Sequence, residues 1–430
     1  MSPTDPSTDP TSFSWTADEI RRVGYRAVDL IAEHLTGLPV EPVFRPVSPA
    51  LAQGMLAEPV PEIGESADAI LERFARDIAP YPFGNGHPRF AAWVNSPPEV
   101  MGVLAASLAA AMNPSVAGGN HAAVWLERQV LEWFKTLIGF PPDAMGLLVS
   151  GGSTAAIVGL AAARHVACAR RGWDVRTNGL QRTALSGGPG RLLVYRTSEG
   201  HGCNQKAIEL LGLGSAAVRL VPTGPDLRML PDELDAMIGT DLAAGHVPMA
   251  VVASAGTVNT GAVDPLDAAA DVCARHGTWL HVDGAYGAPA ILTEHYRDSL
   301  APLSRADSVA IDPHKWLYVP VDAGLVLVRD ARAMRDTFSL VPPYLRTDDN
   351  MLGVQGPPWF SEYGIEQTRP FRALKVWMAL RSIGLGGYRA LISRDIALAQ
   401  HLADRVRATE GFELWQPQGL SIVCFRAVPA

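Results

Sequence analysis

The chain has 430 residues, of which 48% are hydrophobic, so it can bury a large core and is long enough for more than one domain. Its net charge of −8 is modest and its basic residues do not cluster with aromatic ones, which argues against nucleic-acid binding. The four cysteines are scattered without C-x-x-C spacing, which argues against a structural zinc site and a disulfide framework. No histidine pair has H-E-x-x-H spacing, so we expect no catalytic metal.

The N-terminal residues carry no targeting signal that we recognise. Residues 1–14 are rich in Ser, Thr, Asp and Pro and lack the basic-then-apolar order of a signal peptide, so we predict a disordered tail. We find no apolar run of the roughly 18 residues that span a membrane, and the most apolar helical stretch, 100–112, is too short. We therefore expect a soluble, cytoplasmic protein without a membrane partner.

The first predicted element is an amphipathic helix. Thr16 and Glu19 have the spacing of a capping box, and the apolar stripe that follows has helical periodicity up to about Leu38. Pro- and Gly-rich segments follow at 40–61 and 80–88. We assign residues 15–88 to a helical arm that could fold onto its own core or onto a partner subunit.

From about residue 146 to 328, apolar strands alternate with helical stretches. The predicted strands are 147–149, 192–195, 218–221, 249–253, 279–283, 309–311 and 324–328, and the predicted helices between them include 154–170, 231–238 and 265–276. Continuous apolar strands in this order predict an α/β fold whose mostly parallel sheet is covered on both faces. We assign 89–335 to this large domain and 336–430 to a mobile loop and a smaller C-terminal α/β domain, helical from 372 to about 407.

Lys315 follows one of these strands and Asp283 ends another. A lone lysine is usually a solvated surface charge, but this one lies between His314 and Trp316 just after the strand 309–311. In parallel sheets, ligands bind at the carboxyl ends of the strands, where both residues fall. A lysine amine that forms a Schiff base and a carboxylate that keeps a pyridine nitrogen protonated are the two groups that a pyridoxal-phosphate enzyme needs.

Three further loops at the same strand ends carry candidate cofactor contacts. Ser150-Gly-Gly-Ser-Thr154 precedes a helix, whose N-terminus favours phosphate, although such a turn is more often only a cap. His201 could stack on a flat ring, although a lone loop histidine is more often a surface residue. Thr257 places a small hydroxyl group at this edge, and we assign His281, within its strand, no role.

These segments together resemble the group II pyridoxal-phosphate-dependent amino-acid decarboxylases, the family of aromatic-L-amino-acid, histidine and glutamate decarboxylases. The matching segments are His87-Pro-Arg-Phe90, Ser150-Gly-Gly-Ser153, His201, His281-Val-Asp283, Asp312-Pro-His-Lys-Trp316 and Arg372-Ala-Leu-Lys-Val-Trp377. The resemblance covers most of the chain. It implies the fold type I (aspartate-aminotransferase-like) architecture and a homodimer with active sites at the subunit interface.

The resemblance also implies a role for each matching residue. Lys315 is similar to the Schiff-base lysine, Asp283 to the partner of the pyridinium nitrogen and His201 to the histidine stacked on the ring. Gly152, Ser153 and His314 resemble phosphate-side contacts, and Ala285 the small residue on the other ring face. The implied reaction is decarboxylation of an L-amino acid to its amine and CO2, through Schiff-base exchange at Lys315 and a quinonoid intermediate.

The chain departs from the family pattern at two places. Phe360 falls where aromatic decarboxylases carry a loop tyrosine that protonates the substrate carbon, with Tyr363 three residues further on. A phenyl ring cannot donate a proton, so an aldehyde synthase, which couples decarboxylation to oxidative deamination, is an alternative. The family also continues beyond the position of Ala430, so we expect the small domain to be truncated.

The substrate is less defined than the reaction. Trp93 is a candidate wall of the pocket, while segments 93–96 and 115–119 carry small residues where aromatic decarboxylases carry larger ones. We see no arginine placed to pair with a side-chain carboxylate, which favours an aromatic or bulky apolar amino acid. The His-Pro-Arg-Phe segment keeps a glutamate- or aspartate-type decarboxylase open, and Phe360 with the early end keeps open a non-catalytic cofactor-binding homologue.

Overall fold

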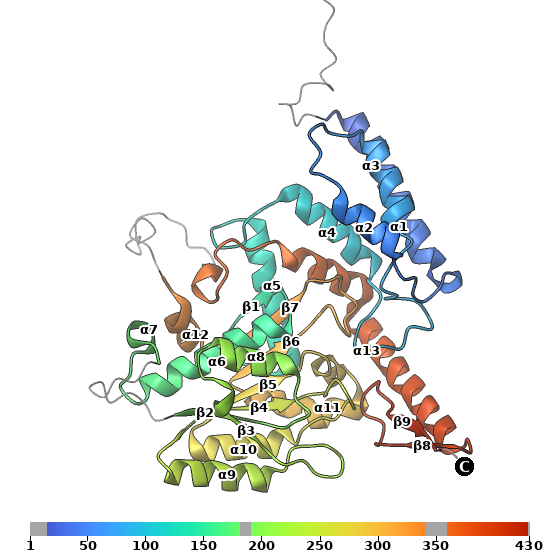
Figure 1. Ribbon diagram of the computed structural model, residues 1–430. Coiled ribbons are helices and arrows are strands. Elements are labelled where there is room, and N and C mark those ends of the chain that lie inside the picture. Colours follow the sequence, from blue (N-terminus) through green and yellow to red (C-terminus); the bar gives the residue numbers. More distant parts are fainter. Residues whose placement is uncertain (1–14, 181–190, 341–358, 429–430) are drawn as a thin grey trace, which may run out of the picture. The chain divides into compact units, whose positions relative to one another are not determined.

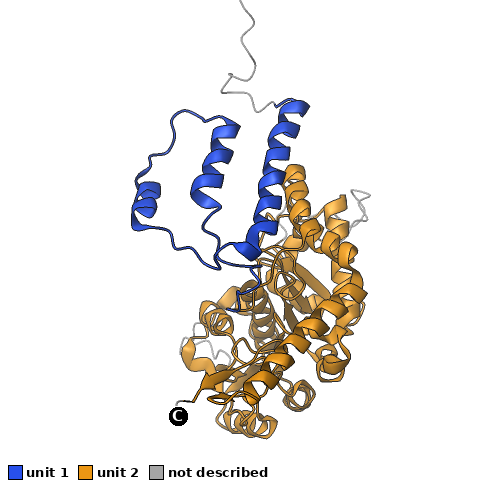
Figure 2. Cartoon of the chain, turned by 90° about the vertical axis from the view of Figure 1, so that its right-hand side faces the viewer, with its two compact units in different colours: residues 1–92 blue, residues 93–430 orange. Residues whose placement is uncertain are grey.

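The computed structural model describes residues 15–180, 191–340 and 359–428. The chain forms two compact units, residues 1–92 and 93–430 (Figure 2). The predicted tail 1–14 lies outside the described residues, as does segment 341–358 of the predicted mobile loop. The division into domains 89–335 and 336–430 stays a prediction.

The first unit contains the predicted N-terminal helix. Helix α1 (Ala17–Gly37) begins with a capping box, in which the Glu19 amide donates to the Thr16 hydroxyl at 3.2 Å and the Thr16 amide donates to the Glu19 carboxylate at 2.7 Å. Helices α2 (Pro49–Ala57) and α3 (Ala67–Arg73) are capped by serine side chains. No residue of α1 is buried.

The second unit is built on a seven-stranded sheet in the order β1-β7-β6-β5-β4-β2-β3 (Figure 1). The strands are β1 (Met145–Val149), β2 (Leu192–Arg196), β3 (Val218–Leu220), β4 (Val247–Ser254), β5 (Trp279–Asp283), β6 (Ser308–Ile311) and β7 (Gly324–Val328). Only β7 pairs antiparallel with its neighbours, β1 and β6. The predicted, mostly parallel sheet is therefore confirmed, and its central strands are mainly apolar and buried because both faces are covered.

Helices cover the two faces of this sheet (Figure 1). Helices α6 and α8 lie on one side of the sheet, and α9 and α10 lie on the other. The helices of this unit are α4 (Val100–Met112), α5 (Ala122–Ile138), α6 (Gly152–Ala169), α7 (Val175–Asn178), α8 (Gly202–Leu210), α9 (Pro231–Ala243), α10 (Leu266–His276), α11 (Glu294–Leu300), α12 (Ala331–Phe338) and α13 (Arg372–Arg407). Helix α13 bends at Gly384, whose φ of 68° is left-handed, and a hairpin of β8 (Phe412–Leu414) and β9 (Phe425–Ala427) follows it.

One helix corrects the expectation drawn from apolar runs. Among the described residues, α6 is long and apolar enough to cross a membrane, in contrast to the expectation that no apolar stretch reaches that length. Its alanines and valines pack against the sheet, and Ala155, Val158 and Ala162 are fully buried. Its apolar composition is therefore that of a core helix.

Candidate active site

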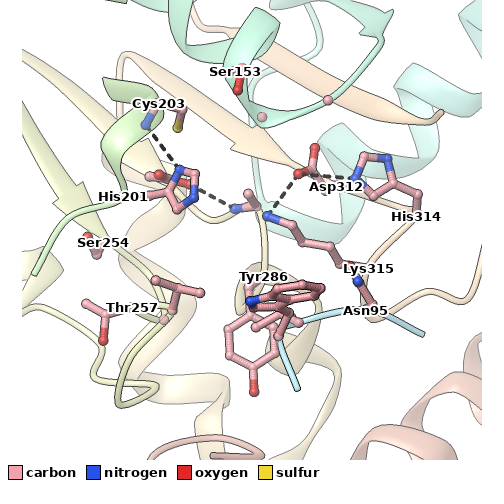
Figure 3. A pocket seen from close by; sticks show the side chains of 18 of the residues that line it. Asn95, Ser153, His201, Cys203, Ser254, Thr257, Tyr286, Asp312, His314 and Lys315 are labelled. Atoms are coloured by element: carbon pink, nitrogen blue, oxygen red, sulfur yellow. Dashed lines mark hydrogen bonds and ion pairs between the residues drawn. The ribbon is translucent and has the colours of Figure 1, made fainter. Parts of the chain in front are cut away.

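A cavity of about 440 Å³ opens at the carboxyl ends of the parallel strands. Nine of the eleven residues predicted for the site line it, and they come from separate parts of the chain: Trp93, Gly152, Ser153, His201, Thr257, Asp283, Ala285, His314 and Lys315. Figure 3 shows His201 and Lys315 both projecting into this cavity. The other two predicted residues, Phe360 and Tyr363, do not line it.

Asp283 is fixed at the end of β5 by strand register. It pairs with Ser254 at the end of β4 and with Ala310 of β6, so these strand ends lie at one level. The Asn204 side-chain amide donates to the Asp283 carboxylate at 2.9 Å, and the Ala285 amide donates to it at 3.3 Å. The carboxylate is thereby held in one orientation at the cavity wall.

Lys315 follows β6 in a tight turn, in which its backbone amide donates to the Asp312 carbonyl at 2.9 Å. The Lys315 Nζ lies 3.1 Å from Oδ2 of Asp312, as the dashed line in Figure 3 marks. Burial raises the pKa of the Asp312 carboxyl, while the neighbouring cations oppose this rise. The site lysine therefore has a carboxylate partner that the sequence analysis did not assign.

His314 is held beside the same carboxyl group. Its Nδ1 accepts a hydrogen bond from the Ala323 amide at 3.0 Å, so a neutral ring carries its proton on Nε2, which lies 3.6 Å from Oδ2 of Asp312. Burial lowers the pKa of the His314 imidazole. The ring therefore faces Asp312 with Nε2, beyond hydrogen-bond distance.

The turn before α6 forms a cradle of small residues. A Cβ added to Gly152 would lie 3.1 Å from Oδ2 of Asp312 and 3.2 Å from the Ala285 Cβ, and one added to Gly324 would lie 2.3 Å from the Gly151 Cα. Glycine is therefore required by close packing at these positions, and residues 150–153 line the cavity, where the amides at the helix N-terminus favour a phosphate. The hydroxyl groups of Ser150 and Thr154 bond each other at 2.8 Å.

His201 is the N-cap residue of α8, and its Nδ1 accepts from the Cys203 amide at 3.2 Å. This bond fixes the ring at the mouth of the cavity. The Thr257 hydroxyl bonds Thr260 at 2.9 Å and accepts from the Ala262 amide at 3.1 Å, so it holds its own loop in shape. Burial raises the pKa of the Cys203 thiol to about 12, which keeps that group neutral.

The residues present fit pyridoxal phosphate. The cavity combines a lysine amine, a separate oriented carboxylate for a ring nitrogen, a histidine at the mouth and a helix N-terminus for a phosphate. Asp312 Oδ1 and Asn204 Oδ1 are buried and have no hydrogen-bond partner among the described residues. Such orphaned acceptors are typical of a site that binds a ligand.

Phe360 and Tyr363 lie elsewhere in the unit. Phe360 is fully buried in the hydrophobic core, and the Arg369 guanidinium lies 5.1 Å from its ring centroid. Tyr363 packs against the same core, and burial raises the pKa of its phenol. The structure therefore brings neither ring to the cavity of its own chain.

Sequence reasoning missed three residues of this site. Asp312 lay within the matching segment but received no role, and Asn204 lies three residues after His201, one helical turn along the same face. Tyr286 lines the cavity, stacks on Trp316 at 4.9 Å between ring centroids and bonds Ser421 of the C-terminal segment. Periodicity could have suggested Asn204, but no local pattern predicts the contact between Tyr286 and Ser421.

The fold and the site define a pyridoxal-phosphate-dependent enzyme of the α/β class. Residues 49–428 match the profile of the pyridoxal-dependent decarboxylase conserved domain, so the chain belongs to this family. It is therefore a carboxy-lyase that uses pyridoxal phosphate to decarboxylate an amino acid, and the alternative of a non-catalytic homologue is not supported.

Several relatives of this chain are named for aromatic substrates. The aromatic-L-amino-acid decarboxylase of Bacillus atrophaeus is 35% identical over 96% of this chain and 83% of its own length. The crystal structure of Oryza sativa TDC with PLP and tryptamine has a TM-score of 0.87 at 30% identity, covering 97% of this chain and 85% of that one. The crystal structure of the 4-hydroxyphenylacetaldehyde synthase of Rhodiola rosea has a TM-score of 0.83 at 26% identity, covering 96% of this chain and 85% of that one.

Proposed function

We propose that this enzyme converts an aromatic or other bulky apolar L-amino acid into its amine and CO2. The observation that carries the proposal is the lining of the cavity around Lys315. It includes Trp93, Val94, Val258 and Tyr286, and among the described lining residues there is no arginine. Apolar and aromatic walls favour a substrate side chain of the same kind, and a buried carboxylate would need a cation that these walls lack.

The residues of the cavity have separable tasks in this reaction. The Lys315 amine would hold the cofactor and yield it to the substrate amine, while Asp283 would keep a proton on the ring nitrogen. When bound, pyridoxal phosphate supplies an electron sink for the pair released as CO2 leaves. His201 and Ala285 would confine the ring, and the N-terminus of α6 would bind the phosphate. The protein thereby decides which bond of the substrate is oriented for cleavage.

Two alternatives remain as competitors of this proposal. Phe360 in place of a loop tyrosine, together with the likeness to the Rhodiola rosea synthase, favours an aldehyde synthase as the second candidate. The burial of Phe360 in the core of its own chain weighs against that candidate. A glutamate- or aspartate-type decarboxylase is weakened because the described cavity wall offers Lys315 as its only lysine or arginine.

The decisive experiment is a product assay on the cofactor-loaded protein. A panel of aromatic, apolar and acidic L-amino acids would be supplied, and CO2, amine, aldehyde, ammonia and peroxide would be measured together. We expect CO2 and amine in equal amounts from an aromatic substrate, and none from the Lys315→Ala variant. Aldehyde with ammonia and peroxide would establish the synthase instead, and turnover of glutamate or aspartate would overturn the substrate class.

We also propose that the enzyme works as a homodimer. Helix α1 supports this proposal because it has no buried residue and its apolar residues Ile20, Tyr25 and Val28 are 48–68% exposed. Light scattering on the purified protein should give twice the chain mass of 45.9 kDa. A mass of one chain at micromolar concentration would contradict the proposal.

A cytoplasmic location is a further proposal. All four cysteines are free thiols, which is usual in reducing compartments. Cell fractionation of the native host should recover the activity with the cytoplasmic enzymes, and recovery with a membrane or secreted fraction would contradict it.

A further inference from the structure

The contact between Asp312 and Lys315 has no task in the function proposed above. Asp312 is 2% exposed at the end of β6, and its Oδ2 lies 3.1 Å from the Lys315 Nζ. The backbone bond from the Lys315 amide to the Asp312 carbonyl closes the turn between them, so the two side chains start from a fixed spacing. A carboxylate this deeply buried needs a cation, and it has one at hydrogen-bond distance.

Each of the other titratable groups of the cavity is either uncharged or already engaged in a hydrogen bond of its own. The Nε2 of His314 lies 3.6 Å from Oδ2 of Asp312, beyond hydrogen-bond distance, and burial lowers the pKa of this imidazole although the Asp312 charge opposes the fall. Burial raises the pKa of the Cys203 thiol to about 12 and that of the Tyr286 phenol higher still, so both remain protonated. His201 accepts from the Cys203 amide at the mouth of the cavity.

Asp283 is the second carboxylate of the cavity, and it has its own partners. It accepts from the Asn204 side chain and from the Ala285 amide, at the end of the neighbouring strand β5. Asp312, in contrast, keeps Oδ1 without a partner among the described residues and directs Oδ2 to the lysine. Asp283 and Asp312 therefore have different partners and different tasks.

We propose that Asp312 is the counter-ion of the Lys315 nitrogen and holds a proton on it, both in the free amine and after condensation with the aldehyde of the cofactor. The inference rests on the proposed function and adds a residue to it. In this condensation the ammonium group gives two of its three protons to the departing oxygen, which leaves as water, and keeps the third. The nitrogen is positive before and after the step, so the anion that stabilises it is needed throughout.

The proton on this nitrogen matters for the next step of the reaction. A protonated nitrogen withdraws electrons from the carbon to which it is joined, and that carbon is the one that a substrate amine must attack. Asp312 therefore sets the highest pH at which substrate can replace Lys315. This task differs from that of Asp283, which acts on the ring nitrogen.

The test is a pH titration of the visible absorbance of the cofactor-loaded protein, which differs between the protonated and neutral linkage. The nearly isosteric variant Asp312→Asn removes the charge, and we expect the titration midpoint to fall by about one to three pH units. Asp312→Glu, which keeps the charge, should recover part of this fall. The matched control Glu209→Gln removes a carboxylate from the exposed end of α8 and should leave the midpoint unchanged.

An unchanged midpoint in Asp312→Asn would overturn the proposal. If that variant does not fold, Lys315→Ala tests the pair from the other side, because a buried carboxyl without its cation should take up a proton. Infrared spectroscopy should then show a neutral carboxyl band that wild type lacks, and absence of that band would overturn the proposal. If the midpoint shifts but the protein decarboxylates no amino acid, the proposed role of Asp312 stands and only the proposed function is refuted.

Discussion

Asn204 of α8 donates a hydrogen bond of 2.9 Å to the carboxylate of Asp283 at the end of β5. Asn204 is fully buried, and it reaches across from the helix that His201 caps. One helix thus presents the residue at the cavity mouth and orients the carboxylate at the cavity wall. The position of Asp283 depends on this side chain as well as on its strand.

Replacing Asn204 by alanine should impair the enzyme without unfolding it. A hydrogen bond to a charged group contributes about 1.5–3 kcal/mol, so we expect kcat/KM to fall roughly 10- to 100-fold. Cofactor affinity, measured by absorbance titration of the cofactor-free protein, should fall with it. Gln205→Ala on the same helix is the control, and equal effects of the two substitutions would contradict a specific task for Asn204.

Replacing Phe360 by tyrosine tests whether this ring acts on the substrate. Phe360 is fully buried against Arg369 and does not line the cavity, so we expect the same ratio of amine to aldehyde before and after the substitution. Tyr363→Phe, the reciprocal change on the same segment, should also leave the ratio unchanged. Aldehyde from wild type and amine from Phe360→Tyr would show instead that the ring reaches the reacting carbon.

Most of the sheet could be predicted because its strands are continuous apolar runs. All seven predicted strands occur. Lys315 and Asp283 line one cavity at the edge of the sheet, as predicted by the rule that ligands bind at the carboxyl ends of parallel strands. Strand ends are local features of a sequence, and the register of a parallel sheet then aligns them. These predictions therefore needed no knowledge of long-range contacts.

The residues that the sequence did not reveal depend on two kinds of contact. Some contacts join parts of the chain that are far apart in sequence, and others are polar contacts set by the shape of a local turn. Tyr286 bonds Ser421, which is 135 residues away, and no periodicity connects them. The sequence around Asp312 and Pro313 does not predict a role for Asp312, because its importance depends on the turn that directs it at Lys315. Phe360 was assigned by position in a loop, but packing against Arg369 decides where its ring lies.

Arg369 and Glu127 form a buried ion pair, 1% and 0% exposed, with 2.5 Å between the guanidinium and Oε1. Arg369 also donates to the carbonyls of Val116 and Leu148. Removing one partner leaves an uncompensated buried charge, so Arg369→Leu should lower the free energy of unfolding by about 3–5 kcal/mol. Urea denaturation would measure this loss.

Two comparisons make that measurement specific. The double variant Arg369→Leu with Glu127→Leu removes both charges and should recover part of the lost stability. Arg21→Ala breaks an ion pair on α1 whose side chains are 62% and 93% exposed, and it should cost less than about 1 kcal/mol. If Arg369→Leu lowers the unfolding free energy no more than Arg21→Ala does, the stability of the protein does not depend on the buried pair of Arg369 and Glu127.

Asp264 should make the stability of the protein depend on pH. Its two carboxyl oxygens accept from the amides of Met229 at 2.8 Å and Ser254 at 2.7 Å, and burial nevertheless raises its pKa to about 6. The folded state therefore binds a proton that the unfolded state, with an ordinary pKa of about 3.9, releases. This contribution to stability is complete below about pH 4 and is lost as the pH rises through 6.

The comparison with Asp264→Asn isolates this effect, because the amide does not titrate. The difference in unfolding free energy, wild type minus variant, should fall by up to about 3 kcal/mol between pH 4 and pH 7. Asn also turns an amide N–H toward a backbone donor, which lowers the stability of the variant at every pH and leaves the slope unaffected. A difference that stays constant across this range would show that the carboxylate is ionised in the folded protein at pH 4, because the two backbone donors outweigh its burial.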